Sequence, residues 1–358
     1  MYSLFRHLLF RLDPETSHQL TLRLLRVAGN FPPSNWLLTQ LNKTPSKPVN
    51  AFGLTFKNPI GLAAGYDKDA VAINGLAALG FGHIEIGTVT PKPQPGNPRP
   101  RVFRLLEDEA VINRMGFPSK GTDFVVDRLK RSNVQTFKQA NVRLGLNLGK
   151  NKDTPLEESA NDYIKLMRRL MFYADYLTIN ISSPNTVGLR RLQGREMLEG
   201  LLDAVANERQ TLSLTPNASP SGRGRLIPIL VKIAPDLNDE ELDDAIGVIL
   251  DKNMDGIIAT NTTLAREGLR RRPERVEGSG YQSETGGLSG SPLRVRSEAV
   301  LRQVVKRVNG KIPIVSVGGI MNPDDAKRRL YMGAALIQLY TGLVYEGPGL
   351  VKRTLVEQ

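Results

Sequence analysis

Short apolar runs alternate with amphipathic stretches along the chain from residue 49 onward. Eight of the runs are typical of buried strands, at 60–64, 83–89, 142–148, 176–181, 227–233, 256–260, 312–319 and 335–340. The stretches between them, such as 157–173 and 239–252, have the spacing of helices with one apolar face. Strands that alternate with helices form parallel sheets, and eight such units in roughly 300 residues predict a closed (β/α)8 TIM barrel. Periodicity alone leaves an open, doubly wound sheet as the alternative.

The first 45 residues have a different pattern. Residues 1–12 carry apolar side chains on one helical face, and residues 15–27 form a second amphipathic segment. Asp13-Pro14 separates the two, because proline suits the first turn of a new helix. The pattern predicts a small N-terminal helical extension, residues 1–45, in front of a barrel domain, residues 46–358. The extension is either a hairpin packed on the barrel, which the pattern alone slightly favours, or a pair of helices at a membrane interface.

Four polar segments are expected to lack regular structure. Residues 29–36, "GNFPPSNW", predict a turn, and residues 42–48 predict a linker. Two long polar segments, 213–225 and 264–285, predict loops. The second loop follows the sixth predicted strand, so it is either a lid over an active site or a simple insertion.

Composition excludes several kinds of site. The chain of 358 residues has no cysteine, which rules out disulfides, thiolate catalysis and cysteine-bound metals. It has only three histidines, so we predict no metal site and no Ser-His-Asp triad. The formal net charge of +12 favours an acidic partner such as nucleic acid, anionic lipid or an anionic substrate. No run approaches the roughly 18 apolar residues that a membrane span needs.

Polar side chains gather where the predicted strands end. Active sites of barrels lie at the carboxyl ends of the strands, and polar groups buried there need partners. Strand ends are often polar simply because loops are, but convergence of so many groups favours a bound ligand. The groups are Gly65, Tyr66, Asp67, Lys68, Thr88, Asn147, Asn180, Ser183, Asn185, Lys232, Thr260, Asn261, Thr262, Tyr340 and Thr341.

Two glycine-containing turns follow the seventh and eighth strands. Gly318-Gly319 stands before Met321-Asn322-Pro323, and Thr341-Gly342 stands before a short predicted helix. Glycine lets backbone N–H groups face an anion, and a helix N-terminus favours negative charge. Each turn alone is equally compatible with a tight turn of no function, but together they predict a phosphate site, which is usual at this place in a TIM barrel.

Several long motifs resemble those of dihydroorotate dehydrogenases. They are "GLAAGYDKD", "IEIGTVTPKPQPGNPRPRVFRL", "INRMGF", "NISSPNT", "VKIAPD", "IATNTT", "TGGLSG" and "VGGI", in this order from about residue 49 to the end. The N-terminal extension resembles that of the class 2 enzymes of this family, which are membrane-associated and quinone-dependent. The resemblance implies an FMN-binding (β/α)8 barrel that oxidises (S)-dihydroorotate to orotate in de novo pyrimidine synthesis.

The resemblance also implies a catalytic base. Class 2 enzymes use a serine from the motif that here reads "NISSPNT", which corresponds to Ser183, whereas class 1 enzymes use a cysteine. The absence of cysteine therefore favours class 2. Spacing alone does not choose Ser183 over Ser182. A serine hydroxyl is neutral at pH 7, so it needs a water-poor pocket and a group that takes its proton onward.

Ligand-binding positions carry over from the same motifs. Lys68 is expected beside the substrate carboxylate, and Lys232 beside the negative charge of a reduced flavin. His18 and Arg104 match polar positions of a quinone tunnel. The expected substrate-binding residues are Lys68, Asn113, Arg114, Met115, Gly116, Phe117, Asn180, Asn185, Asn261 and Thr262. The expected FMN-binding residues are Ala64, Gly65, Tyr66, Asp67, Lys68, Thr88, Asn147, Asn180, Lys232, Thr260, Gly290, Gly319, Tyr340 and Thr341.

The resemblance implies partners and a location as well. We expect one FMN per chain, dihydroorotate and orotate as small-molecule ligands, and a membrane quinone as final electron acceptor. A peripheral monomer is expected, bound by its N-terminal helices to the cytoplasmic side of the inner membrane and without affinity for nucleic acid. One rival is a flavin-dependent tRNA dihydrouridine synthase, which the charge would suit but which relies on a catalytic cysteine. The other is a non-catalytic barrel that binds phosphate or a membrane.

Overall fold

The computed structural model describes residues 2–132, 141–213, 226–270 and 284–357. Most of the two long loops predicted at 213–225 and 264–285 lies outside the described residues. The core of the described part is a closed barrel of eight parallel strands. The strands are β3 (Ile60–Leu62), β4 (His83–Val89), β7 (Arg143–Leu148), β8 (Tyr176–Asn180), β9 (Ile229–Ile233), β10 (Gly256–Ala259), β12 (Ile314–Val317) and β13 (Leu336–Leu339).

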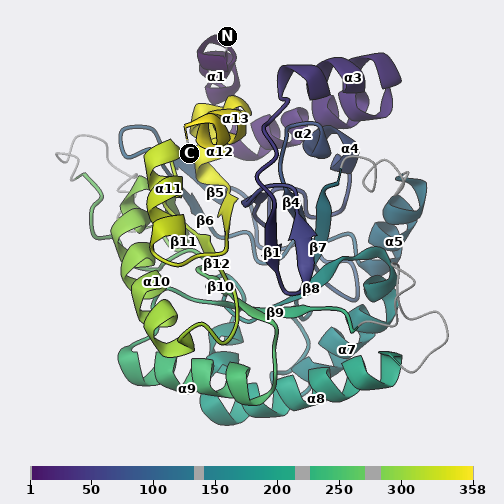
Figure 1. The fold of residues 1–358 in the computed structure, drawn as a ribbon, viewed down its shortest axis with the longest axis vertical. Coiled ribbons are helices and arrows are strands. Elements are labelled where there is room, and N and C mark those ends of the chain that lie inside the picture. The colour runs from purple at the N-terminus through teal and green to yellow at the C-terminus, as the bar shows by residue number, and fades with distance from the viewer. Residues whose placement is uncertain (1, 133–140, 214–225, 271–283, 358) are drawn as a thin grey trace.

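Each barrel strand pairs with the next along the chain, and β13 closes the ring by pairing with β3. Closure confirms the predicted (β/α)8 barrel and excludes the open sheet. The eight predicted strands are all present, because continuous apolar runs mark strands that are buried on both faces. Helices surround the barrel (Figure 1): α4 (Ile73–Ala77), α5 (Thr122–Arg131), α7 (Ser159–Leu170), α8 (Arg195–Ser213), α9 (Asp239–Asp251), α10 (Arg294–Val308), α11 (Pro323–Tyr331), α12 (Thr341–Glu346) and α13 (Gly349–Val356).

Local sequence explains how these helices start and which face they bury. In α9, the Asn238 side chain accepts from the Glu241 N–H while the Glu241 side chain accepts from the Asn238 N–H, which caps the first turn. Leu242, Ala245, Ile246 and Ile249 then recur at helical spacing and are buried against the barrel. Short 3-10 turns at Met171–Tyr173, Leu189–Gln193 and Ser291–Leu293 complete the described helical elements of the barrel domain.

Aromatic rings fill the amino-terminal half of the barrel. A hairpin of β1 (Val49–Ala51) and β2 (Leu54–Phe56) places Phe52 and Phe56 in this region, where they pack on Tyr176 and His83. Glycine on the strands makes the room, because a Cβ at Gly145 would collide with the Tyr176 ring. Polar residues at the carboxyl ends of the strands line a cavity in the opposite half.

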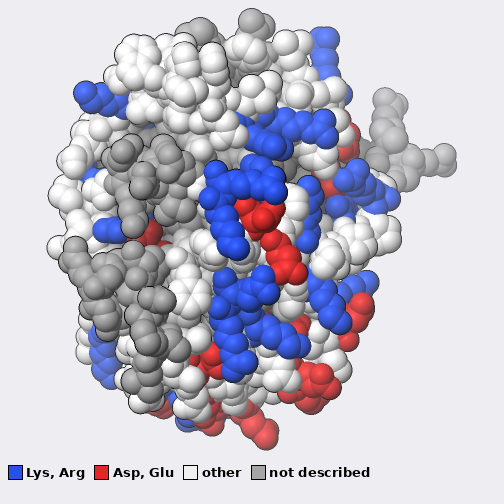
Figure 2. Space-filling model, turned by 90° about the vertical axis from the view of Figure 1, so that its right-hand side faces the viewer, with Lys and Arg blue, Asp and Glu red and all other residues white. Residues whose placement is uncertain are grey.

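The N-terminal extension is three helices rather than two. They are α1 (Tyr2–Phe10), α2 (Pro14–Asn30) and α3 (Pro32–Leu41), which lie together at the top of Figure 1, close to α12 and α13. The turn predicted at 29–36 is confined to Phe31, because Gly29 and Asn30 end α2, and Pro32 and Pro33 occupy the first turn of α3, where proline needs no N–H partner. The upper part of the surface in Figure 2, where this extension lies, is largely free of charged side chains.

A three-stranded antiparallel sheet beside the barrel was not predicted. Its order is β11 (Gly287–Gly290), β6 (Ala110–Asn113) and β5 (Val102–Leu105). Its strands are short, and β11 joins β6 across a long separation in the chain, so no local pattern announces the pairing. This sheet brings Asn113 and Gly290 to the carboxyl ends of the barrel strands.

Candidate active site

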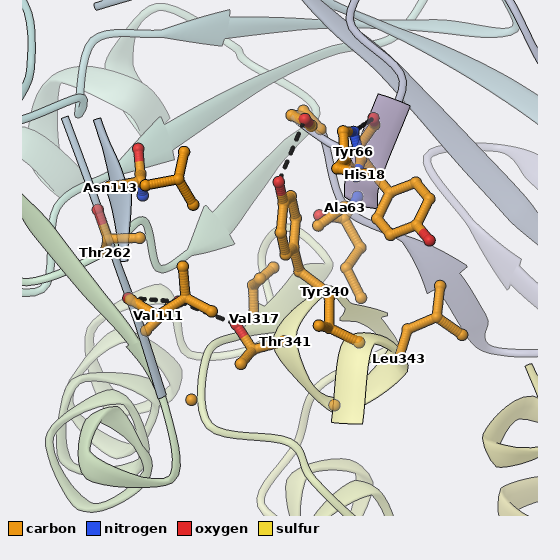
Figure 3. Close-up of a pocket in the computed structure, with 18 of the residues that line it drawn as sticks. His18, Ala63, Tyr66, Val111, Asn113, Thr262, Val317, Tyr340, Thr341 and Leu343 are labelled. Atoms are coloured by element: carbon orange, nitrogen blue, oxygen red, sulfur yellow. Dashed lines mark hydrogen bonds between the residues drawn. The ribbon is translucent and has the colours of Figure 1, made fainter. Parts of the chain in front are cut away.

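One cavity of about 330 Å³ extends from the carboxyl ends of the barrel strands to the helices of the N-terminal extension. Figure 3 shows Asn113 and Thr262 at one side of this cavity, His18 and Tyr66 toward the other, and Tyr340 between them. The extension contributes Leu9, Phe10 and Leu25 among other residues to the walls. The barrel site and the extension therefore line one continuous cavity.

Most of the predicted site residues line this cavity. They come from the barrel strands and their loops, from the antiparallel sheet and from the extension, and they converge although they are distant in sequence. The residues are His18, Ala64, Gly65, Tyr66, Lys68, Thr88, Arg104, Asn113, Met115, Gly116, Phe117, Asn180, Ser183, Asn185, Lys232, Thr260, Asn261, Thr262, Gly290, Gly319, Tyr340 and Thr341.

Three predicted residues do not line the cavity. The carboxylate of Asp67 accepts from the N–H groups of Val71 and Ala72 at 2.9 and 2.8 Å, and so shapes the loop after β3. Arg114 pairs with Glu284 and lies 4.8 Å over the Phe103 ring. Asn147 is fully buried behind Thr88 and Asn180. Asp67 and Asn147 thus support the site from behind its walls, whereas Arg114 is a partly exposed residue beside the antiparallel sheet.

A chain of amide and hydroxyl groups lies at and behind the cavity wall near β7 and β8, with Thr88, Asn180 and Asn261 on the cavity. Asn147 Oδ1 accepts from Thr88 Oγ1 at 2.6 Å and from Asn180 Nδ2 at 3.1 Å. Asn180 Oδ1 in turn accepts from Ser182 Oγ at 3.0 Å. Asn261 Nδ2 donates to Ser182 Oγ at 3.0 Å. Each group is fixed by its neighbours, so the wall presents a defined order of donors and acceptors.

The structure distinguishes the two serines of the loop after β8. Ser182 is fully buried, is bound to Asn180 and Asn261, and is not part of the cavity wall. Ser183 lines the cavity, and its Oγ accepts the backbone N–H of Asn185 at 3.2 Å. A hydrogen bond to the hydroxyl oxygen stabilises the deprotonated form, so this N–H favours release of the Ser183 proton.

Two lysines supply positive charge to the cavity. Lys68 Nζ donates to the carbonyl oxygen of Gly65 at 2.6 Å, and burial lowers the pKa of Lys68 to about 8. Burial also lowers the pKa of Lys232, which the carboxylate of Glu85 partly offsets. Neither ammonium has a carboxylate within salt-bridge distance among the described residues. Buried cations with no carboxylate in direct contact suit an anionic ligand.

A buried arginine supports the glycine turn after β12. Gly318 and Gly319 have φ angles of 105° and 70°, and both line the cavity. Arg329 is fully buried, and its Nη2 donates to the Gly318 carbonyl oxygen at 2.8 Å and to Ser297 Oγ at 2.7 Å. Ser297 Oγ donates to the same carbonyl at 2.8 Å. Because Arg329 and Ser297 hold the Gly318 carbonyl, the backbone of the turn keeps a fixed shape at the cavity wall.

Aromatic side chains and His18 lie where the extension meets the barrel. His18 Nε2 donates to the carbonyl oxygen of Tyr66 at 2.7 Å, and the His18 ring packs edge-on against the Tyr66 ring. Tyr66 makes a similar contact with Tyr340. Burial, followed by the charge of Lys68, lowers the pKa of His18 to about 4, so its imidazole is neutral at pH 7. Arg104 lies 4.5 Å over the Phe10 ring and donates to the Leu9 carbonyl oxygen.

Sequence reasoning missed some polar residues of the site. Gln338 and Ser289 line the cavity, and Ser289 Oγ accepts from Thr341 Oγ1 at 2.9 Å. Gln338 lies within the apolar run of β13, so its polarity was the only available signal. Arg329 lies on a helix rather than at a strand end, and no pattern in the sequence links it to Gly318. Thr186, three residues after Ser183, has a buried hydroxyl without a partner among the described residues.

Residues 47–357 of the chain match the family model described as Dihydroorotate dehydrogenase. The chain belongs to the dihydroorotate dehydrogenase family. It is 49% identical over 351 residues to a protein of Burkholderia thailandensis named dihydroorotate dehydrogenase (quinone), in a match that covers 98% of this chain and 95% of that protein. A protein of the same name from Azotobacter vinelandii is 47% identical over 356 residues, covering 99% and 96% of the two chains.

Solved structures of dihydroorotate dehydrogenase have the same fold. The ligand-free enzyme of Eimeria tenella superposes with a TM-score of 0.85 at 40% identity, covering 96% of this chain and 94% of that chain. The complex of the Eimeria tenella enzyme with ferulenol gives a TM-score of 0.82 at 40% identity, covering 96% and 90%.

Dihydroorotate dehydrogenases are flavin enzymes, and the cavity has groups that fit a flavin. Gln338 is buried, and its Oε1 has no partner among the described residues, which leaves an acceptor for an imide N–H. The Lys232 ammonium lies on the cavity wall, where it can pair with the electron-rich edge of a flavin ring. The positive φ angles of Gly318 and Gly319 give a turn without side chains at the cavity wall. Dihydroorotate dehydrogenase chemistry is therefore compatible with the donor and acceptor groups present.

Proposed function

We propose that this chain oxidises (S)-dihydroorotate to orotate, with FMN as the cofactor and a membrane quinone as the final electron acceptor. One observation carries the proposal: a single cavity is lined by Ser183, lysine and asparagine side chains at its barrel end and by the N-terminal helices at its other end. A substrate, a cofactor and a lipophilic acceptor need such a shared space, because electrons pass only between groups that lie close together.

The barrel end suits a planar ring that carries a carboxylate. Dihydroorotate has ring amide groups that both donate and accept, and an asparagine side chain does the same. Asn113, Asn185 and Asn261 lie on the cavity wall with Asn180. Asn185 Nδ2 donates to Asn113 Oδ1 at 3.1 Å, and Asn185 Oδ1 has no partner among the described residues. Lys68 would pair with the carboxylate.

FMN is the flavin that the glycine turns favour. Gly319 and Gly342 both line the cavity, after β12 and β13, and their backbone N–H groups would bind one terminal phosphate. Lys232, Gln338 and Thr260 would hold the ring. When bound, FMN would accept the hydride from C6 of dihydroorotate and make the electrons available to the quinone.

Ser183 would take the proton from C5 of the substrate. Its Oγ accepts the Asn185 N–H and is 5% exposed as a residue, so bulk water has little access to it. A dry site strengthens the interactions that stabilise the developing charge. The Thr186 hydroxyl, which is buried and lacks a partner among the described residues, is a candidate for passing the proton on.

The extension would form the quinone-binding end and the contact with the membrane. Phe5, Leu24, Val27 and Trp36 are exposed, Val27 by 68% and Trp36 by 65%, although they are apolar. Exposed apolar helix faces with nearby arginines are typical of helices that lie in a membrane interface. Among the described residues no helix is both long and apolar enough to cross a bilayer. We place the enzyme as a peripheral monomer on the cytoplasmic face of the inner membrane, with His18 and Arg104 beside the quinone.

Anaerobic addition of dihydroorotate to the purified protein tests this function. The protein should be yellow, dihydroorotate should bleach the flavin absorbance, and a quinone should restore it. Fumarate and NAD, added separately, should not restore it. A flavin that dihydroorotate leaves oxidised would contradict the proposal. RNA binding with a steep salt dependence would instead favour a tRNA-modifying flavoenzyme.

A further inference from the structure

Glu85 is a fully buried carboxylate in the middle of β4 and is not part of the cavity wall. Its Oε1 accepts from Asn147 Nδ2 at 2.7 Å. Its Oε2 accepts from Gln338 Nε2 at 2.8 Å and from the Tyr176 hydroxyl at 3.3 Å. An ionised carboxylate accepts hydrogen bonds and donates none. Both neighbouring amides must therefore turn their NH2 groups toward Glu85.

The orientation of Asn147 determines that of the next amide. With its NH2 group on Glu85, Asn147 presents Oδ1 to Thr88 and to the NH2 group of Asn180. The NH2 group of Asn180 also donates to Thr88 Oγ1 at 2.9 Å, so its Oδ1 faces the other way. There the oxygen accepts from Ser182 Oγ and, at 3.5 Å, from Asn261 Nδ2. One carboxylate thus fixes the direction of three amides in succession.

Gln338 is a second branch of the same arrangement. Its NH2 group is held by Glu85, so its Oε1 is left without a partner among the described residues. Because Gln338 lines the cavity, this oxygen is an acceptor for a bound ring. The two branches reach the cavity on different strands, β8 through Asn180 and β13 through Gln338.

We infer that Glu85 is a positioning residue that sets which cavity amides donate and which accept, acting through Asn147 and Gln338. The inference rests on the proposed function for the identity of the ligand. Glu85 itself does not line the cavity, so it would contact neither substrate nor cofactor. Its effect on binding comes from the hydrogen-bond polarity that it imposes, because an amide turned by 180° offers a donor where the ligand needs an acceptor.

The substitution Glu85→Gln tests this directly. A glutamine has one accepting and one donating terminal atom, so it cannot accept from both Asn147 and Gln338. One of these two amides must turn, and the polarity of at least one cavity wall reverses. We expect orotate to bind to the FMN-loaded variant about tenfold or more weakly than to the wild-type protein, measured by the change in flavin absorbance. FMN content and melting temperature report separately on folding.

Two further variants separate polarity from general structural damage. In the double variant Glu85→Gln/Asn147→Asp, the introduced glutamine still accepts from Gln338 and donates to one oxygen of the introduced carboxylate. The other oxygen of that carboxylate accepts from Thr88 and Asn180 as before, so orotate affinity should recover most of the loss. Tyr176→Phe is the matched control, because it removes a hydrogen bond from Glu85 without turning an amide. This control should bind orotate like the wild-type protein.

The outcomes distinguish the inference from the proposed function. Wild-type orotate affinity in Glu85→Gln, or a double variant no better than the single one, would overturn the inference while the function stands. Failure of the wild-type protein to bind orotate would contradict the proposed function instead. If Glu85→Gln does not fold, a neutron structure of the wild-type protein decides, since the deuterium atoms of Asn147 must point at Glu85. Deuterium atoms pointing at Thr88 would overturn the inference.

Discussion

Arg101 binds both carboxylate oxygens of Glu15, with nitrogen-to-oxygen distances of 2.7 and 3.1 Å, and thereby joins α2 to the segment before β5. Its Nη1 donates to the carbonyl oxygens of Pro95 and Asn97. Asn97 Nδ2 in turn donates a hydrogen bond to the carbonyl oxygen of Asn185 at 3.3 Å. One buried ion pair therefore connects the N-terminal extension to the loop after β8, which carries Asn185 on the cavity wall.

Glu15→Ala should release α2 from the barrel. Removing one partner of a buried ion pair leaves an uncompensated charge and costs about 3–5 kcal/mol. We expect quinone reduction to fall strongly, because α2 lines the end of the cavity that we assign to the quinone, while flavin reduction by dihydroorotate is largely retained. Stopped-flow measurement of the two half-reactions checks this. Asp127→Ala breaks the exposed pair with Arg131 and should change neither rate. Equal losses in both half-reactions would show that the pair is structural for the whole site.

Ser183→Ala should slow flavin reduction by dihydroorotate by about two to four orders of magnitude while FMN stays bound, because a positioned base is lost. Ser182→Ala removes only the two hydrogen bonds of Ser182 Oγ, to Asn180 and from Asn261, behind the cavity wall and should cost about fivefold. Stopped-flow reduction at pH 7 compares the two. A Ser183→Ala variant that reduces near the wild-type rate would show that another group takes the proton.

Orotate affinity should fall as the pH rises above about 8. Burial lowers the pKa of Lys68 to about 8, and only its protonated form pairs with a carboxylate. Above that pH, Lys68 of the free protein must take up a proton when orotate binds, so the affinity should drop by up to about tenfold per pH unit. Below that pH the affinity should not depend on pH. Orotate titrations between about pH 6 and pH 10 test this. Lys68→Arg keeps its charge over this range and should remove the decline. A decline in orotate affinity that persists in this variant would show that another group titrates.

Arg329→Met should weaken FMN binding more than riboflavin binding. The buried guanidinium holds the Gly318 carbonyl, so its loss should loosen the turn that we assign to the phosphate. We expect the dissociation constant of FMN to rise about tenfold, with that of riboflavin nearly unchanged. Arg328→Met is the matched control, since Arg328 is exposed and pairs with Glu298 and Asp325 rather than with the turn. An equal loss for both flavins would mean that Arg329 acts on overall folding.

The sequence alone predicted the barrel well, for a physical reason. A strand buried on both faces is apolar throughout, and its polar end residues stand out against that run. Lys232, Asn180 and Asn261 were visible in this way, and all three line the cavity. The antiparallel sheet was not visible, because Gly287 pairs with Asn113 across a separation that no local pattern encodes.

The direction of individual side chains was the second limit. Asp67 and Asn147 stand at strand ends like their neighbours, yet neither lines the cavity. Glu85 lies inside an apolar run, and its role depends on partners from β7, β8 and β13 that meet only in the closed barrel. Such roles follow from which atoms donate and accept, and residue type alone does not reveal that.

The hydrogen bonds around Glu85 also restrict how this protein can diverge. Glu85, Asn147, Asn180 and Gln338 come from four different strands, and each supplies the donor or acceptor that its neighbour requires. A change at one of these positions leaves a buried group unmatched unless a second position changes with it. The four should therefore vary together in descendants of this sequence, as a compensated set, while apolar neighbours such as Ile84 and Leu146 drift independently within the limits of their volume.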